Sequence, residues 1–70
     1  MQKLSKAAIG RSYTLQWMFG VPEVMDFLRE HHVEAGDNTQ IMRKLKEALI
    51  VGVKGSRFAM GNEIADRIQV

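Results

Sequence analysis

The stretch from Asp37 to Met60, DNTQIMRKLKEALIVGVKGSRFAM, is the feature that most constrains what this chain can fold into. Asp37 or Asn38 can cap a helix, and the apolar residues that follow recur at the spacing of one helix face. The β-branched run LIVGV then favours a strand, so we predict that the helix gives way near Leu49 to a β-hairpin. The members of the apolar helix face are Ile41, Met42, Leu45, Ala48 and Leu49.

The hairpin needs a turn between LIVGVK and RFAM. Gly55 with Ser56 fits a two-residue turn that has glycine at its first central position. Lys54 would then lie directly opposite Arg57, and two opposed cations are mildly unfavourable. The alternative is a turn at Lys54 and Gly55, which keeps the same apolar face inward and separates the two charges. Both registers predict a short ribbon with a basic tip.

Three short helices are predicted outside this stretch. Residues 3–9 and 14–19 have apolar side chains at helical spacing, and a glycine follows each segment. Residues 62–69 form a closing helix that Asn62 can cap. The helix over residues 14–19 would place three apolar side chains on one face, namely Leu15, Met18 and Phe19.

A longer helix is predicted to begin at Pro22, because proline suits the first position of a helix, and to end at His31 or His32. Adjacent histidines on a helix point about 100° apart, so the pair cannot hold one metal ion, and we predict no metal site. The apolar stripe of the helix comprises Val24, Phe27, Leu28 and His31. Its opposite face is acidic and comprises Glu23, Asp26 and Glu30.

These elements predict a mainly α fold with a small β-hairpin, within a single domain of residues 1–70. Their order, four helices, two strands and a closing helix, is typical of a winged helix-turn-helix. Residues 39–49 would be the recognition helix of that domain, and the hairpin would be its wing.

Composition narrows the function. The 70 residues include no cysteine, and the sequence has no Gly-rich phosphate loop and no spaced set of histidines and carboxylates, so neither an enzyme nor a bound cofactor is expected. No window approaches a membrane span and no signal peptide is evident, which favours the cytoplasm. Residues 21–38 hold five acids against one arginine, whereas residues 39–70 hold six basic residues against three acids. This asymmetry suggests one face for a polyanion.

Double-stranded DNA is the partner that this arrangement predicts. A helix fits the major groove, and a basic hairpin tip can reach a neighbouring phosphate or the minor groove. A domain this small contacts few base pairs, so a homodimer or a cooperating DNA-binding protein is expected. The predicted contacts are Gln40, Arg43 and Lys44 on the helix and Lys54, Ser56 and Arg57 on the wing. Auxiliary phosphate contacts are Lys3, Lys6 and Arg11.

The second half of the chain also resembles the winged helix-turn-helix domains of phage excisionases and MerR-type regulators. The matching positions are Thr39, Arg43, the set Gly55, Arg57 and Phe58, and residues 63–68. The resemblance implies a small DNA-binding protein that regulates transcription or assists recombination, with Thr39 among its DNA contacts.

Two alternatives remain open. Residues 14–31 also have helix-turn-helix spacing, but the second helix would then face phosphates with three carboxylates, so we reject this placement for DNA. Its acidic face could instead suit a basic protein partner. The main alternative function is a protein-interaction module of winged-helix fold, such as a small phage-type inhibitor of a host protein. That function gains support if Trp17, Phe19 or Ile50 lies in an exposed apolar patch.

Overall fold

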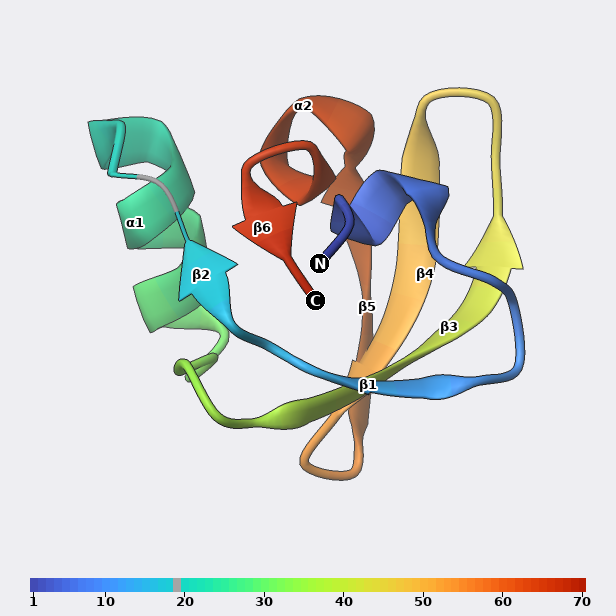
Figure 1. Ribbon diagram of the computed structural model, residues 1–70. Helices are drawn as coiled ribbons and strands as arrows, with labels where there is room; N and C mark the ends of the chain where they lie inside the picture. Colours follow the sequence, from blue (N-terminus) through green and yellow to red (C-terminus); the bar gives the residue numbers. More distant parts are fainter. Residues whose placement is uncertain (19) are drawn as a thin grey trace.

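The computed structural model describes residues 1–18 and 20–70, and it is built mainly of antiparallel strands (Figure 1). Four strands form one sheet in the order β1-β3-β4-β5, and β2 pairs with β6 in a second, two-stranded sheet. The elements in chain order are η1 (Leu4–Lys6), β1 (Ser12–Thr14), β2 (Trp17–Met18), α1 (Pro22–Glu30), β3 (Asn38–Lys44), β4 (Ala48–Val53), β5 (Ser56–Gly61), α2 (Asn62–Ala65) and β6 (Ile68–Gln69).

The core lies between the inner face of the larger sheet and the elements that close over it. Strand β4 is central, and its side chains alternate between the core and the outer face, as a half-buried strand requires. Its inward residues are Leu49, Val51 and Val53. The side chains that pack against them come from η1, β1, β3, β5, α1 and α2 and from the segments that follow; the largest are Leu4, Leu15, Leu28, Ile41, Met60 and Ile68.

The two ends of the chain lie side by side (Figure 1). Gln2 and Val70 exchange two backbone hydrogen bonds of 3.0 and 2.8 Å, and Ser5 of η1 donates a side-chain hydrogen bond to Asp66. Trp17 pairs with Gln69 across β2 and β6. The first and last segments of the sequence therefore close the same side of the core.

The expected recognition helix does not form, and the mainly α winged helix-turn-helix is wrong. Residues 38–44 and 48–53 are instead the paired strands β3 and β4. Thr39 and Ile41 point inward with Gln40 between them, and Ile41 lies opposite Val51. The spacing of apolar residues that resembles a helix face also fits two inward-facing strands, and the long-range pairing of the sheet decides between them.

The predictions for the first third of the chain are wrong in part. Residues 14–19 were expected to be helical, but Thr14 ends β1 and Trp17–Met18 forms β2, while Phe19 lies outside the described residues. The helix expected over residues 3–9 is reduced to the short 3-10 turn η1. At the other end, α2 covers only Asn62–Ala65, and Ile68 belongs to a strand.

The helix predicted from Pro22 is confirmed as α1. Proline stands at its first position, Val24 and Leu28 are buried, and Phe27 is half-buried against the core. This pattern could be predicted because it is local: the proline fixes the helix start, and the apolar stripe repeats every three to four residues.

The hairpin between β4 and β5 has the alternative register. Its central residues are Lys54 and Gly55, with φ values of 52° and 81°, and Val53 pairs with Ser56. Positive φ at both central residues is the condition for a type I′ turn, whose twist matches that of the flanking strands. The turn expected at Gly55 and Ser56 is therefore wrong, and Lys54 does not face Arg57.

Adjacent substitutions on β3 distinguish this strand from the expected helix. Ile41 is fully buried, so Ile41→Ala is expected to lower the free energy of unfolding by about 2–5 kcal/mol. Met42 is 39% exposed on the other face, so Met42→Ala is expected to cost about 0.5 kcal/mol or less. Urea denaturation measures both values. On a helix both side chains would face the core, so equal losses would contradict the strand.

Candidate functional site

The outer face of the four-stranded sheet carries three of the predicted DNA contacts, namely Gln40, Arg43 and Arg57. Cross-strand neighbours form rows on this face, because directly paired residues point to the same side of a sheet. One row is Gln40 on β3, Gly52 on β4 and Arg57 on β5. The next row is Arg43, Ile50 and Ala59.

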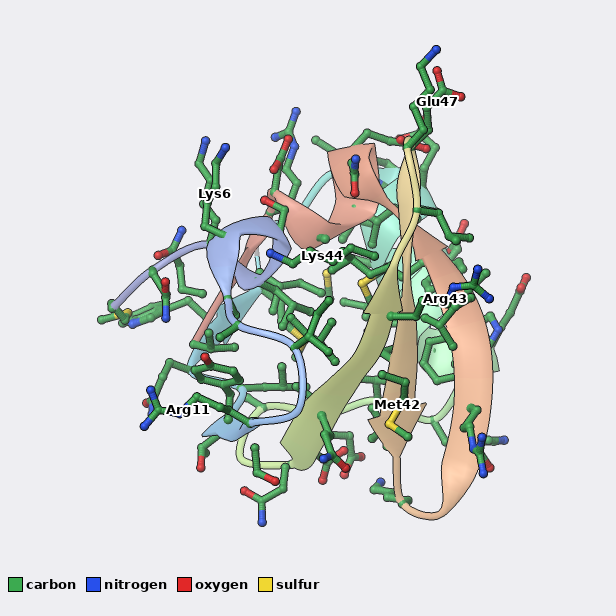
Figure 2. All side chains as sticks on the ribbon, turned by 90° about the vertical axis from the view of Figure 1, so that its right-hand side faces the viewer. Lys6, Arg11, Met42, Arg43, Lys44 and Glu47 are labelled. Atoms are coloured by element: carbon green, nitrogen blue, oxygen red, sulfur yellow. The ribbon has the colours of Figure 1, made fainter. Side chains whose placement is uncertain are left out.

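A β-bulge in β3 shapes this face. The register shifts between Ile41 and Arg43, so Met42 is the extra residue. A bulge leaves its extra residue unpaired and re-aims the side chains around it. As a result, Met42 and Arg43 both project outward over β4 and β5, whereas Lys44 turns back toward η1 (Figure 2).

A shallow groove of about 310 Å³ runs across the outer face at Gly52, and we call it the outer groove. Gly52 forms its floor, since a residue without a side chain leaves the backbone open. Gln40 donates a hydrogen bond of 3.2 Å from Nε2 to the carbonyl of Gly10, which fixes one wall. The groove is lined by Ser12, Asn38, Thr39, Gln40, Met42, Gly52, Lys54, Gly55, Ser56 and Arg57.

The basic side chains around the outer groove differ in whether a carboxylate of the same chain already pairs with them. Among residues 1–18 and 20–70, no carboxylate lies within ion-pair distance of Arg43 or Arg57. Lys54 is engaged: its Nζ lies 3.2 Å from Oδ2 of Asp37 and 3.9 Å from Oε2 of Glu34. Two arginines are therefore left to attract an anion at this face.

Lys54 also joins the hairpin tip to the loop after α1. Its Nζ donates a hydrogen bond of 2.9 Å to the carbonyl of His32, and Oδ2 of Asp37 accepts a hydrogen bond of 2.8 Å from the N–H of Glu34. That backbone hydrogen bond lowers the pKa of Asp37 below its usual 3.8; burial opposes the shift, and Lys54 adds to it. One ammonium group thus lies between the two carboxylates of this loop and offsets one of their two negative charges.

The structure gathers some of the predicted DNA contacts and separates others. Gln40, Ser56 and Arg57 line the outer groove, and Arg43 lies in the next row. Thr39 is buried, and its hydroxyl donates a 3.2 Å hydrogen bond to the carbonyl of Gly52. The other predicted contacts lie elsewhere: Lys54 is in its ion pairs, and Lys44, Lys6 and Arg11 lie toward η1 and β1 (Figure 2), as does Lys3 just before η1.

Trp17, Phe19 and Ile50 are the residues considered above for an exposed apolar patch, and Phe19 lies outside the described residues. Ile50 is half-buried on the outer face, with Ala59 opposite it. Trp17 is 59% exposed, on β2 of the smaller sheet. The sequence signal that could have revealed the groove is Gly52, a glycine inside a β-branched run.

A second hollow, of about 460 Å³, lies beside α1. Its floor is apolar and its rim is charged. One residue of the rim is His32. The preceding residue, His31, has its ring stacked between the rings of Phe27 and Phe58, with a centroid distance of 4.2 Å to each. Nδ1 of His31 lies 2.8 Å from the carbonyl oxygen of Phe27. The imidazole is thus a packing element that joins α1 to β5. The hollow is lined by Met18, Met25, Leu28, Arg29, His32, Val33, Glu34 and Lys54.

Neither a metal-binding cluster nor a membrane-spanning helix is present in the part of the chain that the structure describes. No group of three or more His, Cys, Asp or Glu side chains there could hold a metal ion. None of the described helices is long and apolar enough to cross a membrane.

The fold defines an SH3-like β domain, with a bent antiparallel sheet closed by short helices. The chain belongs to the FeoA domain family, whose family model matches residues 2–70. No curated protein matches the sequence.

Solved structures of the family have the same fold. An iron uptake regulatory protein, FeoA, superposes with a TM-score of 0.83 at 24% identity, covering 94% of this chain and 89% of that one. FeoA of Stenotrophomonas maltophilia, solved in complex with zinc, gives a TM-score of 0.77 at 24% identity, covering 99% and 88%. It is described as a prokaryotic SH3-domain protein with a suggested role in activating ferrous iron transport.

The fold also occurs within a longer protein. A manganese-dependent transcriptional repressor superposes with a TM-score of 0.83 at 13% identity, covering 96% of this chain. The chain spans only 39% of the repressor's length. At this identity the likeness concerns the fold alone.

The family match corrects the functional predictions. The resemblance to phage excisionases and MerR-type regulators is wrong, and so are DNA binding, transcription regulation and a DNA-binding partner. The physical reason is that the recognition helix is absent, since Arg43 and Lys44 stand on a strand. The alternative, a protein-interaction module, agrees better with the family, although its winged-helix fold and phage origin are not supported.

Asp37→Asn is expected to lower the Tm at neutral pH, because it removes the negative charge that pairs with Lys54. A carboxyl group whose pKa is lowered by folding stabilises the folded state at any pH above the pKa that the group has in the unfolded chain. This contribution is lost as the pH falls through the pKa that the group has in the folded protein. The Tm gap between wild type and variant should therefore close as the pH falls below 3.8.

Thermal unfolding followed by circular dichroism at a series of pH values measures this gap. Asp26→Asn is the control, because it removes a carboxylate that also pairs with a basic side chain, Arg29, but that is exposed on α1. A Tm gap for Asp37→Asn that stays constant down to the most acidic pH would contradict the assignment.

Proposed function

We propose that this chain is an accessory protein of ferrous iron transport that acts by binding a protein partner and not by catalysis. The observation that carries the proposal is the family match, which extends over residues 2–70. The activating role suggested for FeoA of Stenotrophomonas maltophilia supports the same process. The cytoplasm is the compartment that we propose, as the sequence predicted.

The surface chemistry supports binding as the mode of action. The outer face of the sheet combines apolar side chains, Ile50 and Ala59, with two arginines that have no carboxylate partner among the described residues. Such a mixture of apolar floor and polar rim is typical of protein interfaces. Iron is the cargo of the proposed process, so the protein itself needs no resident metal ion to take part.

Deleting the gene from its own organism is expected to slow the uptake of radiolabelled ferrous iron under reducing conditions, and a plasmid copy of this chain should restore the rate. An accessory role predicts that uptake depends on the amount of the chain but that the chain alone transports nothing. Uptake of manganese measured in the same cells is the control for general effects on growth or membrane energy. Ferrous iron uptake that is unchanged by the deletion would contradict the proposal.

A further inference from the structure

Gly52 is the fifth of the six residues of β4, and nothing in the fold requires a glycine there. Its φ is not in the left-handed region. A Cβ built on Gly52 would meet Sδ of Met42 at 3.6 Å and two carbonyl oxygens at 3.9 and 4.0 Å, which are ordinary van der Waals contacts. Glycine weakens the interior of a strand and often marks a place where a ligand or another backbone approaches the sheet closely. Its presence at this position points to an occupant from outside the chain.

We infer that the outer groove is the docking site for an acidic segment of a protein partner. The segment lies across Gly52, places a carboxylate on Arg57 and packs an apolar side chain against Ile50 and Met42. The inference rests on the proposed function, because it names the chemistry of the partner at the surface through which an accessory protein would act.

Charge complementarity selects an acidic occupant. Among the residues that the structure describes, those that line the groove include no Asp or Glu. Arg57 forms the β5 wall, and within residues 1–18 and 20–70 no carboxylate is close enough to pair with it or with Arg43. A guanidinium group presents a planar fork of donors that matches a carboxylate in two parallel hydrogen bonds. The two arginines flank β4 from opposite sides, so a segment that crosses the sheet can meet both.

The apolar side chains of the outer face require that the occupant also carries an apolar side chain. Ile50 and Ala59 are paired neighbours, and the thioether of Met42 extends over Gly52. Met42 is 39% exposed and unbranched, so it can adapt to the shape of an apolar side chain. This surface favours a segment in which apolar and acidic residues stand close together.

The same face also sets the direction of the segment. The carboxylate of Glu63 lies against the outer side of Gly61, at the opposite end of β5 from Arg57. An acidic residue of the partner would be repelled by Glu63 and attracted by Arg57. The acidic part of the segment therefore belongs near Arg57, and its apolar part belongs near Ile50.

Peptide selection on the purified full chain tests the occupant. A random peptide library displayed on phage is selected on the wild type, and the recovered peptides are then measured on Gly52→Leu, whose added side chain fills the groove and leaves the inner face unchanged. Recovered peptides are expected to combine Asp or Glu with apolar residues. Their affinity should fall about tenfold or more for Gly52→Leu and for Arg57→Glu.

Matched controls separate the groove from general effects. Gly20→Leu adds the same side chain where a Cβ meets nothing within 4 Å, and Arg67→Glu makes the same charge reversal at an exposed position in α2–β6. Both are expected to keep wild-type affinity, and circular dichroism verifies that every variant is folded. Peptides without acidic residues, or equal binding to Gly52→Leu, would overturn the inference. Self-association of the chain that Gly52→Leu abolishes would also overturn it, because a second copy would then be the occupant.

Ferrous iron uptake separates this inference from the proposed function. If the wild-type chain restores uptake to the deletion strain and folded Gly52→Leu does not, both stand. If both chains restore uptake equally, the proposed function stands and the groove is not the docking site. If the wild-type chain fails to restore a lost uptake, the proposed function fails, whatever the peptide selection shows.

Discussion

The alternation of side chains along β4 is the constraint on which the rest of the structure depends. Leu49, Val51 and Val53 fill the core from β4, which pairs with β3 on one side and with β5 on the other. A shift of one residue would exchange these side chains with those of the outer face. The Lys54–Gly55 turn fixes the register with β5, and the bonds from Lys54 to the loop after α1 secure that turn. The same register that completes the core therefore also places Gly52 between Gln40 and Arg57.

The sequence predicted those elements whose determinants are local. Helix α1 follows from Pro22 and a repeating apolar stripe, and the hairpin of residues 48–61 follows from a β-branched run and a glycine. The segment of residues 39–49 was predicted as a helix because its apolar spacing fits one and because Arg, Lys, Leu and Glu are good helix formers. In the structure this segment pairs with β4, and Ile41 lies opposite Val51. This pairing is a tertiary contact, and local propensity carries no information about it.

The candidate site shows the same division. Arg43 and Arg57 were predicted to be exposed, and they are, because a charged side chain without a buried partner must remain in water in either fold. Their arrangement could not be predicted, since it depends on a bulge that turns Met42 and Arg43 to one side. Gly52 was visible in the sequence as part of a strand-like run. Only the structure shows that neither its backbone angles nor its neighbours require a glycine.

The geometry of the basic residues explains why a basic hairpin does not make this protein a DNA-binding domain. Binding to a duplex draws its strength from the neutralisation of several phosphates, so it needs several cations on one accessible surface. On the outer face of this sheet only Arg43 and Arg57 are available among the described residues, because Lys54 is paired with Asp37 and Lys44 turns toward η1. Two arginines beside an apolar floor can instead bind individual carboxylates while the floor buries an apolar side chain. That combination of two arginines and an apolar floor suits a protein partner and does not suit a polyphosphate such as DNA.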